Sequence, residues 1–194
     1  MSTASSTLYR YADFLTEPVP ENFPSPNRNR VRINPLERGA YFPEVSLEEG
    51  GRLFNLGTQP LVVAFYSWHW NAYGDRYFAE LQQLQAAVEA AGAKLVVIST
   101  EDKKQFKAIH PTSPAFDIIH DTQHRIARKA GIYSETDPIW GRVSGVNEDV
   151  PVPAVYVLSP SSEINFAFVD HYLQNSLPVE KIIAAIGNQL AISA

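Results

Sequence analysis

A strand–helix–strand unit over residues 61–99 most limits the folds open to this chain. Leu61–Tyr66 is a continuous apolar run, which is typical of a strand buried on both faces. Lys94–Ser99, with the apolar stretch Leu95–Ile98 inside it, is expected to be the next buried strand. Between them, apolar residues recur at helical spacing and the pattern stops at Gly92 (Tyr77, Leu81, Leu84, Val88). Two strands joined by a helix pack in parallel with a right-handed crossover, so we predict an α/β fold.

The second half of the chain predicts strands that run in the opposite direction. Ala154–Leu158 and Ile164–Val169 have strand-like composition, and the link between them is too short for a parallel crossover. Pro178 then opens a last helix with an apolar face (Ile182, Ile183, Ile186). A parallel half followed by an antiparallel half predicts a thioredoxin-like fold, with a central mixed sheet flanked by helices.

Shorter elements complete this pattern. We predict a hairpin around Gly50 and Gly51, a helix over residues 101–109 and a strand over residues 116–120. A further helix is expected over residues 121–130, with Asp121 as its N-cap.

Residues 1–40 differ from the rest of the chain because they are rich in proline. We predict an arm over residues 1–40 and one domain over residues 41–194. Three arginines in the arm either bind an anion or form ion pairs with the acidic body of the protein (Arg28, Arg30, Arg32).

The chain of 194 residues contains no cysteine, which excludes disulfides, thiolate nucleophiles and zinc–cysteine sites. Its 16 basic and 21 acidic residues give a net charge of −5, which argues against nucleic acid or an anionic membrane as a partner. The start of the chain lacks the pattern of a secretory signal, and no apolar run is long enough to span a membrane. We therefore expect a cytoplasmic location.

Two segments carry a family resemblance: FYSWHWNAYGDRYFAELQ at residues 65–82 and VPVPAVYVLSPSSEINFAFVD at residues 150–170. With VVIST at residues 96–100 and HDTQHRIARKAGI at residues 120–132, they resemble the peroxiredoxin-like branch of the AhpC/TSA (alkyl hydroperoxide reductase and thiol-specific antioxidant) family. The resemblance covers about residues 41–186. It implies a thioredoxin-like domain with a peroxiredoxin-type N-terminal hairpin.

In this family, a WCPYC-type redox motif opens the first long helix. The resemblance places Trp70 on the motif tryptophan, Asn71 on the nucleophilic cysteine, Tyr73 on the tyrosine and Gly74 on the second cysteine. Since neither residue contains sulfur, thiol peroxidase and disulfide exchange chemistry are excluded. We expect Asn71 to cap the helix with its side chain, and Gly74 either to permit the close approach of another group or to loosen the first turn.

The resemblance also implies a cis proline at Pro153, facing the same site, so Val152 and Pro153 join the candidate ligand-binding residues Trp70, Asn71, Tyr73, Gly74 and His69. Within the aromatic cluster at this site, we expect Tyr66 and Trp68 to lie in the core and His69 and Trp70 to be exposed.

Three functional hypotheses follow. The first is a non-catalytic binding or interaction module that uses the former active-site face for a small molecule or a protein. The second is a cysteine-independent enzyme with His69 or Tyr73 as acid or base, in a family whose homology otherwise suggests an antioxidant oxidoreductase. The third is a structural role in a homodimer, formed through the arm or the loop near Trp140.

Two other combinations of residues give weaker evidence for a functional site. His120 and His124 have the spacing of a metal-chelating pair, but the predicted cap at Asp121 places His120 outside the helix. Asp170 and His171 lack an accompanying nucleophile motif, so no hydrolase triad is supported. We expect neither a metal nor a cofactor.

Overall fold

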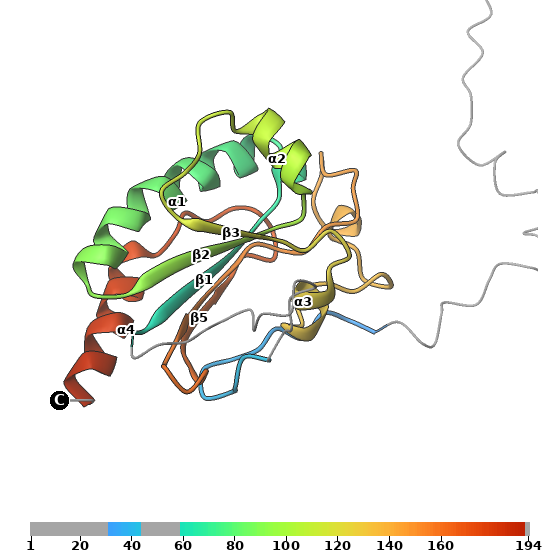
Figure 1. Ribbon diagram of the computed structural model, residues 1–194. Coiled ribbons are helices and arrows are strands. Elements are labelled where there is room, and N and C mark those ends of the chain that lie inside the picture. The colour runs from blue at the N-terminus through green and yellow to red at the C-terminus, as the bar shows by residue number, and fades with distance from the viewer. Residues whose placement is uncertain (1–30, 44–58, 193–194) are drawn as a thin grey trace, which may run out of the picture. The chain divides into compact units, whose positions relative to one another are not determined.

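The computed structural model describes residues 31–43 and 59–192. The predicted hairpin, Arg28, Arg30 and most of the predicted arm lie outside these residues. Within them, five strands form one sheet in the order β3-β2-β1-β4-β5 (Figure 1). The strands are β1 (Leu61–Tyr66), β2 (Lys94–Ser99), β3 (Asp117–His120), β4 (Ala154–Leu158) and β5 (Ile164–Val169).

The strand directions confirm the predicted mixed sheet. β1 pairs in parallel with β2, and β2 with β3. β4 is antiparallel to both β1 and β5. This arrangement is a thioredoxin-like sheet.

Helices cover this sheet and connect its strands. α1 (Ala72–Ala90) contacts β1, β2 and α4 (Val179–Ile192), and α4 in turn contacts β4 and β5, so the two long helices share one face of the sheet. The shorter elements are α2 (Lys103–Ile109), α3 (Arg125–Lys129) and two 3₁₀ turns, η2 (Trp68–Trp70) and η3 (Ile139–Gly141). In the described part of the chain, we find no helix with the length and apolar character needed to cross a membrane.

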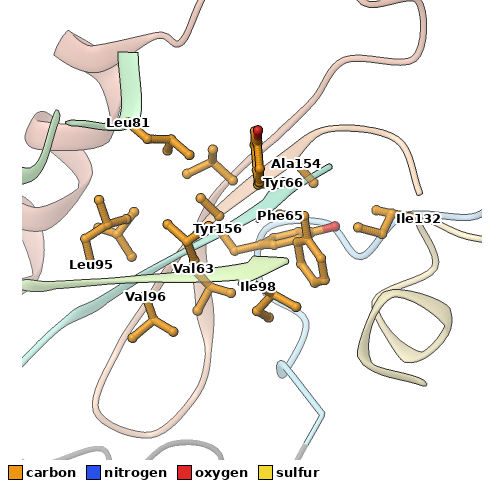
Figure 2. Close-up of a cluster of buried hydrophobic side chains, with 14 of the residues drawn as sticks. Val63, Phe65, Tyr66, Leu81, Leu95, Val96, Ile98, Ile132, Ala154 and Tyr156 are labelled. Carbon is orange, nitrogen blue, oxygen red and sulfur yellow. The ribbon is translucent and has the colours of Figure 1, made fainter. Parts of the chain in front are cut away.

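The hydrophobic core is centred on β1, all of whose residues are buried. Side chains from β1, β2, β4 and α1 meet there, together with Ile132 from the segment after α3 (Figure 2). Phe65 and Tyr156 pack edge to face with ring centroids 6.3 Å apart. This core holds the carboxyl end of β1, where the chain turns toward α1, in a fixed position.

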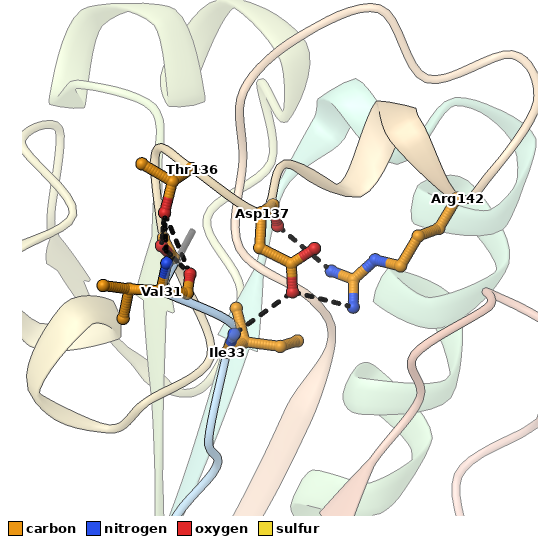
Figure 3. A network of polar contacts seen from close by, with 6 residues as sticks. Val31, Ile33, Thr136, Asp137 and Arg142 are labelled. Carbon is orange, nitrogen blue, oxygen red and sulfur yellow. Dashed lines mark hydrogen bonds and ion pairs between the residues drawn. The ribbon is translucent and has the colours of Figure 1, made fainter. Parts of the chain in front are cut away.

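Residues 31–43 run along the domain and are held by hydrogen bonds to it. The Leu36 amide donates to the Ala130 carbonyl at 3.1 Å. The Ile33 amide donates to Asp137 Oδ2 at 3.2 Å, and the same carboxylate contacts Arg142 (Figure 3). Gly131 is required here, since its φ is +72° and an added Cβ would lie 1.9 Å from the Asn34 carbonyl oxygen. The boundary between arm and domain near residue 40 stays a prediction.

The predicted start of the helix over residues 121–130 is wrong, because α3 begins at Arg125. Asp121 nevertheless supplies the acceptors for its first turn. The Asp121 carboxylate accepts hydrogen bonds from the amides of Arg125, Ile126 and Ala127 at 2.8–3.0 Å. The cap therefore acts from four residues before the helix, across a turn in which His124 has a φ of 52°.

Candidate functional site

The candidate site lies where β1 ends and α1 begins. After Tyr66 the chain forms the 3₁₀ turn η2, and α1 starts at Ala72. The His69 amide donates to Ser67 Oγ at 3.3 Å, and the Asn71 amide donates to the Trp68 carbonyl at 2.9 Å. These short-range bonds fix the backbone of the segment that carries the aromatic cluster.

Asn71 is the residue that the resemblance places on the family's nucleophilic cysteine, and in the structure it is exposed. The expected side-chain cap is absent from α1, so that prediction is wrong. Asn71 has φ 55° and ψ −133°, whereas a capping residue is typically extended. Its Nδ2 group instead donates to the Gly145 carbonyl, which ties the start of α1 to the loop before β4.

The burial of the two neighbouring tryptophans is the reverse of the prediction. Trp70 is only 2% exposed, and its Nε1 donates to the Pro151 carbonyl at 3.0 Å. Trp68 is 44% exposed, and Tyr66 is buried as expected. His69 is half-buried, although it was expected to be exposed. The reason is the 3₁₀ turn, in which successive side chains point about 120° apart, so that only one of the three residues faces the core.

Gly74, which the resemblance places on the second cysteine, permits a close approach of the backbone. A Cβ at this residue would lie 2.9 Å from the Ser67 carbonyl oxygen. Backbone atoms cannot move away as easily as a flexible side chain, so a residue larger than glycine is disfavoured here.

Tyr73 is buried between other rings and charged groups. Its ring stacks on Tyr77 at 5.7 Å, and the Arg76 guanidinium lies 5.0 Å from its centroid. Burial, reinforced by the Asp170 carboxylate, raises the pKa of Tyr73 far above its ordinary value. The hydroxyl therefore remains protonated at neutral pH and is a poor general base.

Val152 and Pro153 are buried, and they continue the sheet rather than line an exposed surface. The Val152 amide donates to the Ile132 carbonyl at 3.1 Å, and the Pro153 carbonyl accepts from the Asp170 amide at 2.9 Å. The described residues contain no cis peptide bond, so the implied cis proline at Pro153 is wrong. The extended chain before β4 instead extends the β4–β5 ladder by one bond.

Glu101 is a central residue of this region that the sequence analysis missed. Its side chain lies at the carboxyl ends of β1 and β2, and the residue is 2% exposed. The carboxylate accepts from the Trp68 amide at 2.9 Å and from three hydroxyl groups (Ser67, Ser99, Thr100). A buried carboxylate needs such donors. The signal in the sequence was that Glu101 follows two hydroxyl residues, Ser99 and Thr100, at the end of a buried strand.

The two spaced histidines have separate environments. His120 ends β3, and its Nδ1 lies 2.7 Å from the Glu101 carbonyl oxygen. His124 precedes α3 and packs on Tyr133, with ring centroids 4.4 Å apart. Among the residues that the structure describes, no group of three or more His, Asp or Glu side chains is placed to hold a metal ion.

The sheet order and the helix that starts directly after β1 define a protein of the peroxiredoxin-like, thioredoxin-fold class. The sequence model of the AhpC/TSA family matches residues 39–167, and the chain belongs to this family. Because it has no cysteine, it cannot carry out thiol-dependent peroxidase chemistry. Among curated protein sequences, none matches this chain.

Several solved structures share the fold. A thiol peroxidase from Chromobacterium violaceum is 10% identical with a TM-score of 0.59, covering 81% of this chain and 90% of that one. Mycobacterium tuberculosis AhpC is 16% identical with a TM-score of 0.59, covering 83% and 95%. The mitochondrial 2-Cys peroxiredoxin from Plasmodium falciparum is 10% identical with a TM-score of 0.62, covering 80% and 95%. At these identities the likeness extends to the fold alone.

Proposed function

We propose that this chain is a non-enzymatic member of the AhpC/TSA family whose surface at the start of α1 binds a partner. The observation that carries the proposal is that the polar groups at the former catalytic position are held in internal hydrogen bonds. Asn71 bonds to Gly145, Trp70 to Pro151, and Glu101 to the turn between β1 and α1. These bonds serve to stabilise the loops, and none of them activates a nucleophile.

The binding surface consists of Trp68, His69 and Asn71. Trp68 presents a large exposed ring on a backbone held by Glu101, and the His69 ring lies 6.0 Å from it. Aromatic side chains on a fixed backbone lose little entropy when a partner binds, and they often contribute most of the binding energy. The partner is a protein or a small molecule that packs on the indole.

The cysteine-independent enzyme remains the second candidate, with His69 as its acid or base. Half-burial next to an exposed aromatic ring is the observation that favours His69. The raised pKa of Tyr73 argues against the other residue named for this role. Any turnover found for this protein should therefore disappear in a His69→Ala variant.

A peroxide-consumption assay tests the loss of chemistry. Hydrogen peroxide and cumene hydroperoxide are followed separately with dithiothreitol as reductant. We expect rates equal to those of heat-denatured protein, because no thiolate is available. Turnover above that control would contradict a non-enzymatic role.

Site-specific photo-crosslinking tests the binding surface. A benzophenone amino acid replaces His69 in one protein and Tyr41 in a control. Tyr41 is 66% exposed and bridges to Glu163 in the β4–β5 turn, at the other end of the sheet. In cells that express the chain naturally, we expect a discrete crosslinked species at position 69 that is absent at position 41. Equal labelling at both positions would overturn the proposed surface, and no labelling at position 69 would overturn a protein partner.

A further inference from the structure

A cavity of about 320 Å³ lies between α4, β5 and the segment around Arg38. Lys181, Ala185 and Asn188 contribute to it from α4 at helical spacing, and Asn165 and Phe166 contribute from β5. The Arg38 segment is anchored, because the Gly39 amide donates to the Ile164 carbonyl at 2.8 Å and the Ile164 amide donates to the Ala40 carbonyl at 2.8 Å.

This cavity is distinct from the surface at the start of α1. Ile164 pairs with Leu158, and Leu158 pairs with Leu61 at the first residue of β1. The cavity therefore lies at the end of β1 opposite to Tyr66. Ligand binding in this cavity is therefore independent of partner binding at the start of α1.

The charge of the cavity is opposite to that of the whole chain. Its lining includes Arg38 and Lys181 and no carboxylate, although the net charge of the protein is −5. The neighbouring residues Glu37, Glu163 and Glu180 are acidic. Even so, within residues 31–43 and 59–192, neither cation lies within ion-pair distance of a carboxylate.

Two cations on one concave surface, with no carboxylate of the described residues at ion-pair distance, repel each other, and an anion between them would be attracted to both. The side-chain amides of Asn165 and Asn188 can donate hydrogen bonds to anionic oxygens. Phe166 and the alanines of α4 offer contacts to an apolar group. Volume, charge and lining together favour a small amphipathic ligand.

We propose that this cavity binds a small organic anion, in which a phosphate or carboxylate contacts Arg38 and Lys181 and an apolar group packs on Phe166. Either anionic group could contact the two cations, so phenyl phosphate and benzoate serve as separate probes for a phosphate and a carboxylate. Whichever probe binds more tightly identifies the head group.

The test is a ¹H–¹⁵N NMR titration of the full chain at low ionic strength, where charge interactions are screened least. We expect saturable shifts at the amides of Phe166, Ala185 and Asn188. Lys181→Gln and Arg38→Gln should each weaken phenyl phosphate binding about fivefold, as expected for one partly exposed ion pair. Both side chains are exposed, so these variants should fold normally.

Lys107→Gln is the matched control, since Lys107 is exposed on α2 and does not line the cavity. It changes the net charge equally and should leave the affinity unchanged. Equal weakening in Lys107→Gln, or shifts confined to other surfaces, would overturn the site. Inorganic phosphate that binds as tightly as phenyl phosphate would overturn the role of the apolar group.

Discussion

Asn71 combines a backbone conformation that few residues accept with a side-chain bond to a distant loop. At φ 55° and ψ −133°, glycine and asparagine are tolerated best. Asn71→Ala loses the bond to Gly145 and keeps a Cβ in this conformation, so we expect a loss of about 1–2 kcal/mol in the free energy of unfolding. Asn71→Gly loses the same bond but relieves the backbone, and should be the more stable variant. Urea unfolding compares the two, and equal midpoints would contradict backbone strain at residue 71.

Gly74 and Gly187 make a matched pair of helical glycines. A Cβ at Gly74 would lie 2.9 Å from the Ser67 carbonyl oxygen, whereas one at Gly187 would meet nothing within 4 Å. Gly74→Ala should therefore lower stability by about 1–3 kcal/mol, although alanine is the better helix former. Gly187→Ala should raise it by up to about 1 kcal/mol. Thermal unfolding should show shifts of opposite sign, and a stabilised Gly74→Ala would show that there is room for a side chain at residue 74.

At the scale of elements, Glu101 joins the ends of β1 and β2 to the turn η2. Glu101→Gln replaces an acceptor oxygen with a donor that faces other donors, so we expect a loss of about 2–4 kcal/mol. The matched control is Glu148→Gln at an exposed loop position, which should change stability by less than about 0.5 kcal/mol. Hydrogen exchange in a Glu101→Ala variant supplies a second measurement, because there the Trp68 amide loses its acceptor and should exchange faster. An unchanged Trp68 amide would mean that Glu101 does not hold the turn.

The strands were easier to predict than the starts of the helices. Leu61–Tyr66 and Lys94–Ser99 follow directly from local apolar runs, and the structure places both strands at those residues. The start of α1 depends on a bond from Asn71 to Gly145, and the first turn of α3 depends on Asp121 across a left-handed His124. The bond from Asn71 to Gly145 is a tertiary contact, and the bonds from Asp121 depend on a local turn with positive φ at His124. Periodicity along the chain indicates neither of them.

At the scale of the molecule, the fold followed from the order of the elements, and the absence of thiol chemistry followed from the composition. The exposure of the site residues could not be predicted from either of these. The 3₁₀ turn directs Trp70 into the core, where its ring reaches Pro151, and directs Trp68 outward from a backbone that bonds to Glu101. Both contacts join segments far apart in the sequence, so local pattern assigned the two tryptophans to the wrong environments.

The core also determines how the whole molecule responds to alkali. Burial raises the pKa of five described tyrosines above the ordinary value (Tyr66, Tyr73, Tyr77, Tyr133, Tyr156). For Tyr133, burial and the adjacent Asp149 carboxylate raise the pKa to about 12. In the unfolded chain these hydroxyl groups lose their protons near pH 10. Between pH 10 and pH 12, the unfolded state therefore binds fewer protons than the folded state.

Stability should accordingly fall as the pH rises through this window, by at most about 1.4 kcal/mol per pH unit for each such tyrosine and by about 1 kcal/mol per pH unit on average for Tyr133. Urea unfolding at a series of pH values measures the slope directly. Tyr133→Phe removes one of these groups, so its slope between pH 10 and pH 12 should be shallower by about that amount, even though the loss of the bond to Asp149 lowers its stability at neutral pH. A flat profile above pH 10, or an identical slope in Tyr133→Phe, would mean that the tyrosines ionise without opposing the fold.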